Sequence, residues 1–285
     1  MNNNSEIAVI GLGAMGLPIA NNLAKAGVST EAWNRSPKIG LDHSIQLRNR
    51  LNEVHAPIVL TVLPDIHQVR EVLDEGLRKS ISEDSILVVM GTVSPEAMRE
   101  LSSDLAKECI HVLDAPMSGG VKGAVDATMS LMVGGDPKVF ERVEPYFKRI
   151  GRNIQLFGPV GAGQLAKASN QIIVAVTLAG ICEAILLAKR SGLEIEQVIN
   201  ALSDGLAGSK VLDQKRNMLI KEDFTPGGKS RFLIKDLAFA LDAASQKNLS
   251  LPFTELAQEI YSQMVLHGAG DLDIAAVIKE LAREK

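Results

Sequence analysis

The chain has 285 residues, with 30 Lys and Arg against 34 Asp and Glu, which gives a formal net charge of −4. This acidic balance argues against a nucleic-acid partner, because nucleic-acid binders usually present a basic face. Hydrophobic residues at 46% and charged residues at 22% argue against disorder. The length is enough for about two domains.

The cysteines and the start of the chain bear on compartment and partners. Cys109 and Cys182 stand far apart without metal-ligand spacing, so we expect reduced thiols and no metal site. The polar start MNNNSE has no secretory pattern, so we expect a cytoplasmic protein. Residues 172–188 are mostly apolar, but 17 residues that include Glu183 suit a buried helix better than a membrane span. We therefore expect no membrane partner.

Short apolar runs alternate with helical patterns over roughly the first 160 residues. Near-continuous apolar runs are typical of strands that are covered on both faces of a parallel sheet. Helices are expected at 16–26 and 95–107, the second with Ser94 as its N-cap and Pro95 in its first turn. The expected strands are 6–11, 29–34, 57–63, 85–90, 110–114, 130–133 and 154–157.

After Gly163 the pattern becomes helical only. One long helix is expected at 164–191, and the helices expected after it are 194–206, 209–220, 232–247 and 254–267. The sequence therefore predicts an α/β Rossmann-type doubly wound domain, 1–162, followed by an all-α C-terminal domain, 163–285, joined by the long interdomain helix. The apolar character of that helix predicts a homodimer or homotetramer formed through the helical domain.

A Gly-x-Gly-x-x-Gly pattern lies between the first expected strand and the first expected helix. Gly11 permits a tight turn, Gly13 lets the backbone approach a pyrophosphate, and Gly16 lets helix and strand pack closely. The N-terminus of the helix also offers N–H groups and a positive dipole to phosphates. The residues expected to bind a dinucleotide here are Gly11, Leu12, Gly13, Ala14, Met15 and Gly16.

The residues after the second expected strand indicate which dinucleotide binds. NAD sites usually place Asp or Glu there to accept from the ribose 2′-OH, whereas this chain has Asn34, Arg35 and Ser36. Arg35 can bind a 2′-phosphate through charge-assisted hydrogen bonds, and Asn34 does not repel it. We therefore expect NADP(H) in preference to NAD(H), and the alternative is that Arg35 is an exposed surface cation.

Four segments carry a resemblance to a known family. They read GLGAMGLPIANNLAKAG at 11–27, DAPMSGGVKGA at 114–124, GAGQLAKASNQ at 161–171 and IKDLAFAL at 234–241. In this order they resemble the β-hydroxyacid dehydrogenases, which include 3-hydroxyisobutyrate dehydrogenases, short semialdehyde reductases and, most similar in the third segment, tartronate semialdehyde reductases. The resemblance implies an NAD(P)-dependent enzyme that interconverts a hydroxyacid and a short carboxylated aldehyde.

Lys167, Asn170 and Gln171 are spaced i, i+3 and i+4, so they share one face of the long helix. The resemblance implies that Lys167 is the general acid that protonates the substrate oxygen, and the base in the reverse direction. It also implies that Asn170 or Gln171 orients the substrate. The alternative is that Lys167 only extends its ammonium group to solvent from a buried helix.

Ser118, Gly119 and Gly120 follow the end of a predicted strand, where ligands bind in open α/β sheets. The glycines let backbone N–H groups converge on a carboxylate, and the Ser118 hydroxyl can donate as well. The resemblance implies that this loop holds the substrate carboxylate and hydroxyl. The alternative is an ordinary glycine turn.

Further residues are assigned by the resemblance to the coenzyme. Leu63, Pro64 and Thr92 follow the third and fourth expected strands and resemble the residues that border the nicotinamide. Lys235 resembles a family lysine that reaches from the helical domain towards the coenzyme. The alternative for Lys235 is a surface charge pair with Asp236.

Two departures from the family pattern bear on the pocket. Gly91 stands where the family often has Ser. Gly228 stands where the family often has Phe, and Lys229 and Arg231 lie beside it. These residues indicate either a roomier, more basic pocket for a second acidic group or an exposed loop.

Other functions remain open at this point. A cofactor-binding regulatory protein without catalysis is disfavoured by the presence of Lys167 and Asn170. A 6-phosphogluconate-type dehydrogenase usually has a much larger helical domain, and imine reductases on this scaffold usually replace the lysine. The sequence leaves open the direction of the reaction and the choice among glyoxylate, malonate-type and succinate-type semialdehydes.

Overall fold

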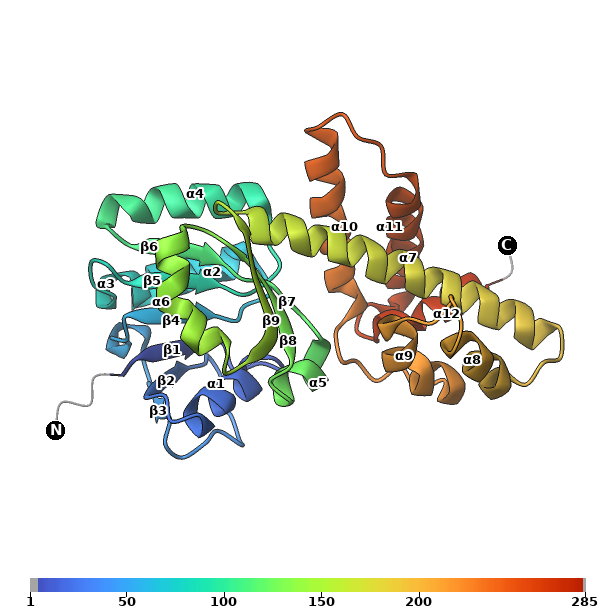
Figure 1. Cartoon of the computed structure of the whole chain (residues 1–285), viewed down its shortest axis with the longest axis horizontal. Helices are drawn as coiled ribbons and strands as arrows, with labels where there is room; N and C mark the ends of the chain where they lie inside the picture. Colours follow the sequence, from blue (N-terminus) through green and yellow to red (C-terminus); the bar gives the residue numbers. More distant parts are fainter. Residues whose placement is uncertain (1–4, 284–285) are drawn as a thin grey trace. The chain divides into compact units, whose positions relative to one another are not determined.

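The computed structural model describes residues 5–283, so residues 1–4 of the polar start lie outside the described part of the chain. The chain divides into two compact units, Met1–Lys167 and Ala168–Lys285. The boundary falls within α7 (Ala162–Arg190), so one continuous helix contributes residues to both units (Figure 1).

The first unit is built on one mixed sheet. Its strands are β1 Ile7–Ile10, β2 Thr30–Trp33, β3 Gln46–Leu47, β4 Ile58–Thr61, β5 Ile86–Val89, β6 His111–Asp114, β7 Met117–Ser118, β8 Met129–Gly134 and β9 Gly151–Gly158. Their order is β3-β2-β1-β4-β5-β6-β8-β7, with β9 also paired to β8. All pairs from β3 to β6 are parallel, β8 is antiparallel to β6 and β7, and β9 is parallel to β8.

Helices cover both faces of this sheet. They are α1 Gly16–Lys25, α2 Ile66–Val72, α3 Arg78–Ser80, α4 Pro95–Leu105, α5 Gly120–Val125 and α6 Pro137–Phe147. Successive residues of a strand point to opposite faces, so Ile7 and Val9 lie in one apolar core, and Ala8 and Ile10 lie in the other. The first core includes buried residues of α1 and α6, and the second includes buried residues of α2 and α4. Burial on both sides explains the near-continuous apolar runs of the strands.

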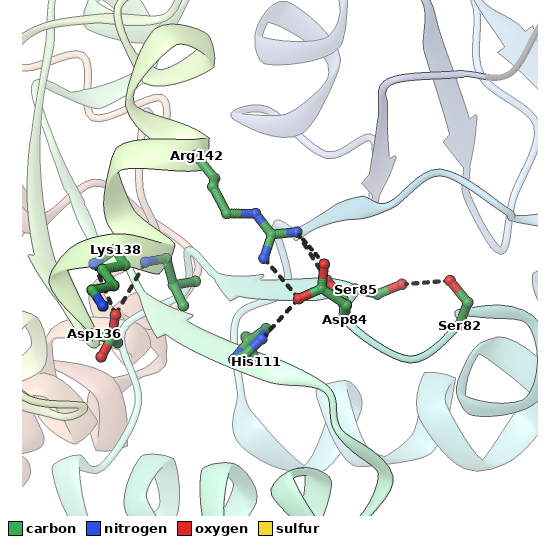
Figure 2. Close-up of polar contacts among 8 residues, drawn as sticks. Ser82, Asp84, Ser85, His111, Asp136, Lys138 and Arg142 are labelled. Atoms are coloured by element: carbon green, nitrogen blue, oxygen red, sulfur yellow. Dashed lines mark hydrogen bonds and ion pairs between the residues drawn. The ribbon is translucent and has the colours of Figure 1, made fainter.

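A polar cluster ties α6 to the amino ends of β5 and β6 (Figure 2). Arg142 donates to both carboxylate oxygens of Asp84, at 2.9 and 3.1 Å, and His111 Nε2 lies 3.1 Å from the same carboxylate. Hydrogen bonds from Arg142 and His111 hold the pKa of Asp84 below its usual value. Because ligands bind at the carboxyl ends of parallel strands, this cluster braces the sheet at the edge opposite the candidate site.

The second unit contains helices around one apolar core. They are the later part of α7 with α8 Ile195–Ser203, α9 Lys210–Lys221, α10 Ser230–Ser245, α11 Pro252–Met264 and α12 Val277–Leu281. Leu178 and Cys182 of α7 pack in this core together with Leu237 of α10 and Tyr261 of α11. Burial raises the pKa of the Cys182 thiol to about 12. The predicted fold class, a doubly wound α/β part followed by helices, is confirmed.

Helix α7 is long and apolar enough to cross a membrane by length and hydropathy, and 33% of its most apolar stretch is buried. The same length and composition occur in core helices of soluble proteins. The buried residues of the later part of α7, among them Ala175, Leu178, Ile181, Cys182 and Ile185, belong to the core of the second unit.

Candidate active site

The glycine loop between β1 and α1 has the close contacts that its pattern predicts. Gly11 has a φ of +96°, and a Cβ there would lie 2.7 Å from the carbonyl oxygen of Val62. A Cβ on Gly16 would overlap the carbonyl oxygen of Gly11, so only glycine allows this contact between helix and loop. A Cβ on Gly13 would meet nothing within 4 Å, so this residue faces open space. The loop therefore leaves room for a ligand at Gly13.

The start of α1 is suited to an anion. Its N-cap, Met15, provides no side-chain hydrogen bond, and its first turn contains no acidic residue. In contrast, α4 is capped by Ser94 and α6 by Asp136. Helix N-termini carry N–H groups without intrahelical partners and a positive partial charge. The loop and helix start therefore fit the pyrophosphate of a dinucleotide, with Ala14 exposed between them.

Asn34 connects the end of β2 to the glycine loop. Its Oδ1 accepts a hydrogen bond of 2.7 Å from the backbone N–H of Leu12. Its Nδ2 donates a hydrogen bond of 2.7 Å to the backbone oxygen of Ser36. Both contacts agree on the orientation of the amide, because a backbone N–H can only donate and a carbonyl can only accept. The two segments predicted to bind the dinucleotide are thus linked directly.

Arg35 lies after β2 as predicted, but it has partners that the sequence analysis did not foresee. Its guanidinium lies 3.1 Å from the carboxylate of Glu71 and 3.0 Å from that of Glu75. The hydrogen bond that Arg35 donates to Glu71 and the charges of both glutamates raise the pKa of Arg35. The arginine is therefore an exposed cation already paired with two carboxylates.

The segments after β4 and β5 touch each other. A Cβ on Gly91 would overlap the carbonyl oxygen of Leu63, so the loop at Leu63 and Pro64 rests directly on a glycine backbone. Gln164 of α7 fixes the second segment. Its side chain donates a hydrogen bond of 2.9 Å to the Gly91 carbonyl oxygen and accepts one of 3.0 Å from the Val93 N–H. Thr92, half-buried, lies between these two anchored residues.

Asp114 anchors the start of α7 to the end of β6. Its carboxylate accepts from the N–H groups of Gly161, at 2.7 Å, and Gln164, at 2.8 Å. Burial raises the pKa of Asp114 to about 6, against the opposing effect of these hydrogen bonds. Lys167 follows Gln164 by three residues and is only 8% exposed. Asp114 and Gln164 together therefore fix the helical turn that precedes Lys167.

Ser118, Gly119 and Gly120 form the junction between β7 and α5. Gly119 and Gly120 have φ values of +131° and +65°, which L side chains rarely adopt. Ser118 pairs with Ser130 of β8 in the antiparallel ladder, and a Cβ on Gly120 would meet open space. The glycines therefore make a sharp, open turn at the position expected for the substrate carboxylate.

Four polar residues of the second unit form one connected chain. Asn170 Nδ2 donates to Gln171 Oε1 at 2.9 Å, and Gln171 Nε2 donates to Asp236 Oδ2 at 2.7 Å. Lys235 Nζ donates to the other oxygen of Asp236 at 2.8 Å and lies 5.3 Å from the centre of the Phe239 ring. Asp236 is only 6% exposed, so Lys235 is paired with a buried carboxylate rather than with a surface one.

The predicted site residues thus form two groups, one in each unit, and contacts connect residues within each group. In the first unit, contacts join the glycine loop, Asn34, Leu63 and Gly91, and Lys167 ends this unit. In the second unit, Asn170, Gln171 and Lys235 meet around Asp236. Residues that the sequence analysis did not assign are Asp114, Gln164, Asp236, Glu71 and Glu75, although the first three lie inside the quoted motifs.

The described residues also form a cavity, but they form no metal-binding cluster. A hollow of about 570 Å³ is lined by α4, the loop before α7 and the start of α7, including Arg99, Val160 and Leu165, and none of the predicted site residues lines it. Within residues 5–283, no cluster of three His, Cys, Asp or Glu side chains could hold a metal ion.

A glycine loop with an open, uncapped helix start, at the carboxyl edge of a doubly wound sheet, is typical of a dinucleotide-binding protein, and the family matches below make this chain an NAD(P)-dependent oxidoreductase. Comparisons with known proteins give the family. Residues 6–158 match the family model described as the NAD binding domain of 6-phosphogluconate dehydrogenase. Residues 161–281 match the model described as NAD-binding of NADP-dependent 3-hydroxyisobutyrate dehydrogenase. The chain belongs to the β-hydroxyacid dehydrogenase family, and it acts on CH–OH groups.

Individual relatives cover almost the whole chain. It is 37% identical to the 2-hydroxy-3-oxopropionate reductase of Escherichia coli over 97% of both chains. It is 32% identical to the NAD-dependent L-serine dehydrogenase of Pseudomonas aeruginosa, over 96% of this chain and 97% of the relative. The Mycobacterium tuberculosis 3-hydroxyisobutyrate dehydrogenase solved with L-serine has a TM-score of 0.83 and 29% identity, over 98% of this chain and 100% of the other. These matches support hydroxyacid dehydrogenase activity.

Proposed function

We propose that this enzyme reduces a short carboxylated aldehyde to the hydroxyacid, or catalyses the reverse, with Lys167 as general acid and base. The observation that carries this proposal is the burial of Lys167, which is only 8% exposed. Lysines are rarely buried unless they are paired or functional. An amine held at such a position can exchange a proton with a substrate oxygen within hydrogen-bond distance.

The other residues bind and orient. Gly11 to Gly16 hold the pyrophosphate, and Leu63, Pro64 and Thr92 border the nicotinamide, which supplies or accepts the hydride. Ser118, Gly119 and Gly120 hold the substrate carboxylate. Lys167 gives its proton to the carbonyl oxygen as that oxygen becomes a hydroxyl, and takes the proton back in the oxidation.

Asn170 is proposed to orient the substrate, with Gln171 behind it. Both ends of the Gln171 amide are already engaged, by Asn170 Nδ2 at 2.9 Å and by Asp236 at 2.7 Å. Asn170 uses its Nδ2 in this contact, so the orientation of its amide is set by Gln171. Gln171 is therefore a positioning residue that acts through Asn170.

The substrate is proposed to carry one carboxylate and about three carbons, like the 2-hydroxy-3-oxopropionate in the name of the Escherichia coli relative. Lys229 and Arg231, considered above as ligands for a second acidic group, both pair with Asp271, at 2.7 and 2.6 Å. This shared carboxylate engages both side chains and offsets one of their two positive charges, which favours a substrate with a single acidic group. A screen with NADPH of aldehydo acids from C2 to C5, together with an aldehyde that carries two carboxylates, tests both the size and the charge of the substrate. Faster turnover of the C5 compound or of the dicarboxylated aldehyde would contradict the proposal.

NADP(H) is proposed as the preferred coenzyme, with Arg35, Asn34 and Ser36 around the 2′-phosphate. The absence of an acidic residue at these three positions supports this preference. Measurement of kcat/KM for NADPH and NADH tests it directly, and a preference for NADH would refute it.

The role of Lys167 is tested by Lys167→Ala. We expect kcat to fall by at least about 100-fold, because a positioned proton donor contributes about that much. NADPH binding, followed by fluorescence, should remain. Lys148→Ala is a matched control, since Lys148 is an exposed lysine paired with Glu144 at 2.9 Å. Near-normal turnover of Lys167→Ala would rule out the assignment.

A further inference from the structure

Arg35 stands between two carboxylates that lie on one side of the neighbouring helical segment. Glu71 belongs to α2 and Glu75 to the π-helical turn that continues it, Leu73–Leu77. Residues at i and i+4 of a helix are neighbours, and two like charges at this spacing repel each other. Arg35 contacts both carboxylates, at 3.1 and 3.0 Å, and offsets this repulsion.

The position of Glu75 is fixed by the backbone of the turn. Gly76 has a φ of +143°, which ends the regular helix and is accessible mainly to glycine. A Cβ on Gly76 would lie 3.3 Å from the Cβ of Asn52, so the turn rests closely against the segment that follows β3. Glu75 is therefore presented to Arg35 by an anchored turn rather than by a free loop.

We infer that Glu71 and Glu75 set the coenzyme selectivity by competing with the 2′-phosphate for Arg35. This inference rests on the proposed role of Arg35 in NADP(H) binding. One guanidinium and two carboxylates sum to a net charge of −1. A 2′-phosphate must therefore displace at least one carboxylate or bind beside both of them, whereas the uncharged 2′-OH of NAD(H) faces no such competition.

The consequence is that the enzyme uses both coenzymes. The two glutamates lower the affinity for NADP(H) without lowering that for NAD(H), so both coenzymes are used and the preference for NADP(H) is held small. Glu71 and Glu75 are thus specificity-determining residues that act through Arg35.

The test uses Glu71→Gln/Glu75→Gln in the full-length protein, with the dissociation constants of NADPH and NADH measured by fluorescence titration. We expect the Kd for NADPH to fall about tenfold, as a charge-assisted pair becomes available to the phosphate, and the Kd for NADH to stay unchanged. The control is Glu144→Gln/Glu222→Gln, which removes two exposed carboxylates paired with Lys148 and Lys189 and should change neither constant. The single variants Glu71→Gln and Glu75→Gln should each lower the Kd for NADPH by a smaller factor than the double variant does.

Arg35→Gln separates this inference from the proposed function. On its own, it should raise the Kd for NADPH and not that for NADH, and it should abolish the gain from Glu71→Gln/Glu75→Gln when the three changes are combined. An unchanged ratio of constants in the double variant, or an equal gain without Arg35, would overturn the inference while the effect of Arg35→Gln upholds the NADP(H) assignment. An Arg35→Gln variant that binds NADPH normally would overturn both.

Discussion

Gln171 donates a hydrogen bond of 2.7 Å to the buried carboxylate of Asp236 and accepts one of 2.9 Å from Asn170. This arrangement predicts unequal effects of mutation at the two amides. Asn170→Ala should lower kcat/KM about 100-fold, because it removes the group proposed to orient the substrate. Gln171→Met keeps the size of the side chain but not its hydrogen bonds, and it should lower kcat/KM only about tenfold. Steady-state kinetics with saturating NADPH provide the measurement, and a larger loss at Gln171 would assign the substrate contact to that residue.

Gly91 is predicted to tolerate no side chain. In Gly91→Ala the new Cβ would overlap the Leu63 carbonyl oxygen, so the loop at Leu63 and Pro64 must move. We expect a loss of about 2 kcal/mol in the free energy of unfolding and a higher KM for the coenzyme. Gly180→Ala is the matched control, because Gly180 lies in α7 with nothing within 4 Å of its Cβ position. Denaturant unfolding of both variants provides the measurement, and equal stability would contradict the contact.

Asp114 is predicted to make stability depend on pH. Its pKa is raised from 3.8 to about 6, so between these values the folded state binds a proton that the unfolded chain has lost. The free energy of unfolding should therefore fall by about 3 kcal/mol from this group as the pH rises from about 4 to above 6, and then stay level.

Asp114→Asn isolates this contribution. The variant lacks the titrating group, so the stability difference between the wild type and Asp114→Asn should be larger at pH 4.5 than at pH 7.5. Denaturant titrations at the two pH values provide the measurement. If Asp114→Asn does not fold, the ¹³C chemical shift of the wild-type carboxyl group, titrated by NMR, gives its pKa directly. A difference that grows with pH, or a carboxyl pKa below 3.8, would contradict the prediction.

The two cysteines are predicted to differ in reactivity. Cys109 is exposed, whereas Cys182 is buried and burial raises the pKa of its thiol to about 12. Because the thiolate is the reactive form, iodoacetamide should label one cysteine of the native protein without loss of activity. Mass spectrometry should place the label on Cys109, and Cys109→Ser should abolish it. Labelling of Cys182 before unfolding would show that the core of the second unit opens readily.

Much of this fold follows from local pattern. The long apolar runs and the helix N-cap at Ser94 predicted the strands of the parallel core and α4 at close to their observed bounds. The two-residue strands β3 and β7 were missed because so short a segment has no periodicity. Helix α6 is not among the helices named from the sequence, although Asp136 caps it and Pro137 begins it, the same signals that indicate α4.

The candidate site was predictable only in part, because some of its contacts join residues that are far apart in the sequence. Motifs located the glycine loop, Lys167 and the amides beside it, because the residues of each motif are neighbours in sequence. The contacts of Arg35 with Glu71, of Asp114 with Gly161 and of Leu63 with Gly91 join the ends of different elements. Such contacts depend on strand order and loop conformation, which no local pattern encodes.

The hydrogen bond between Asn34 and the Leu12 N–H has a practical consequence for enzyme engineering. A designer who wants to convert the enzyme to strict NAD(H) use would first try Asn34→Asp, the usual exchange at this position. The new carboxylate would keep the acceptor for Leu12 but lose the donor to Ser36, and it would bring negative charge beside the backbone proposed to hold the pyrophosphate. A change at Asn34 that alters recognition of the ribose would thus also alter the loop proposed to bind the phosphates. A successful redesign must therefore restore both the hydrogen bond to Ser36 and the charge balance at the glycine loop.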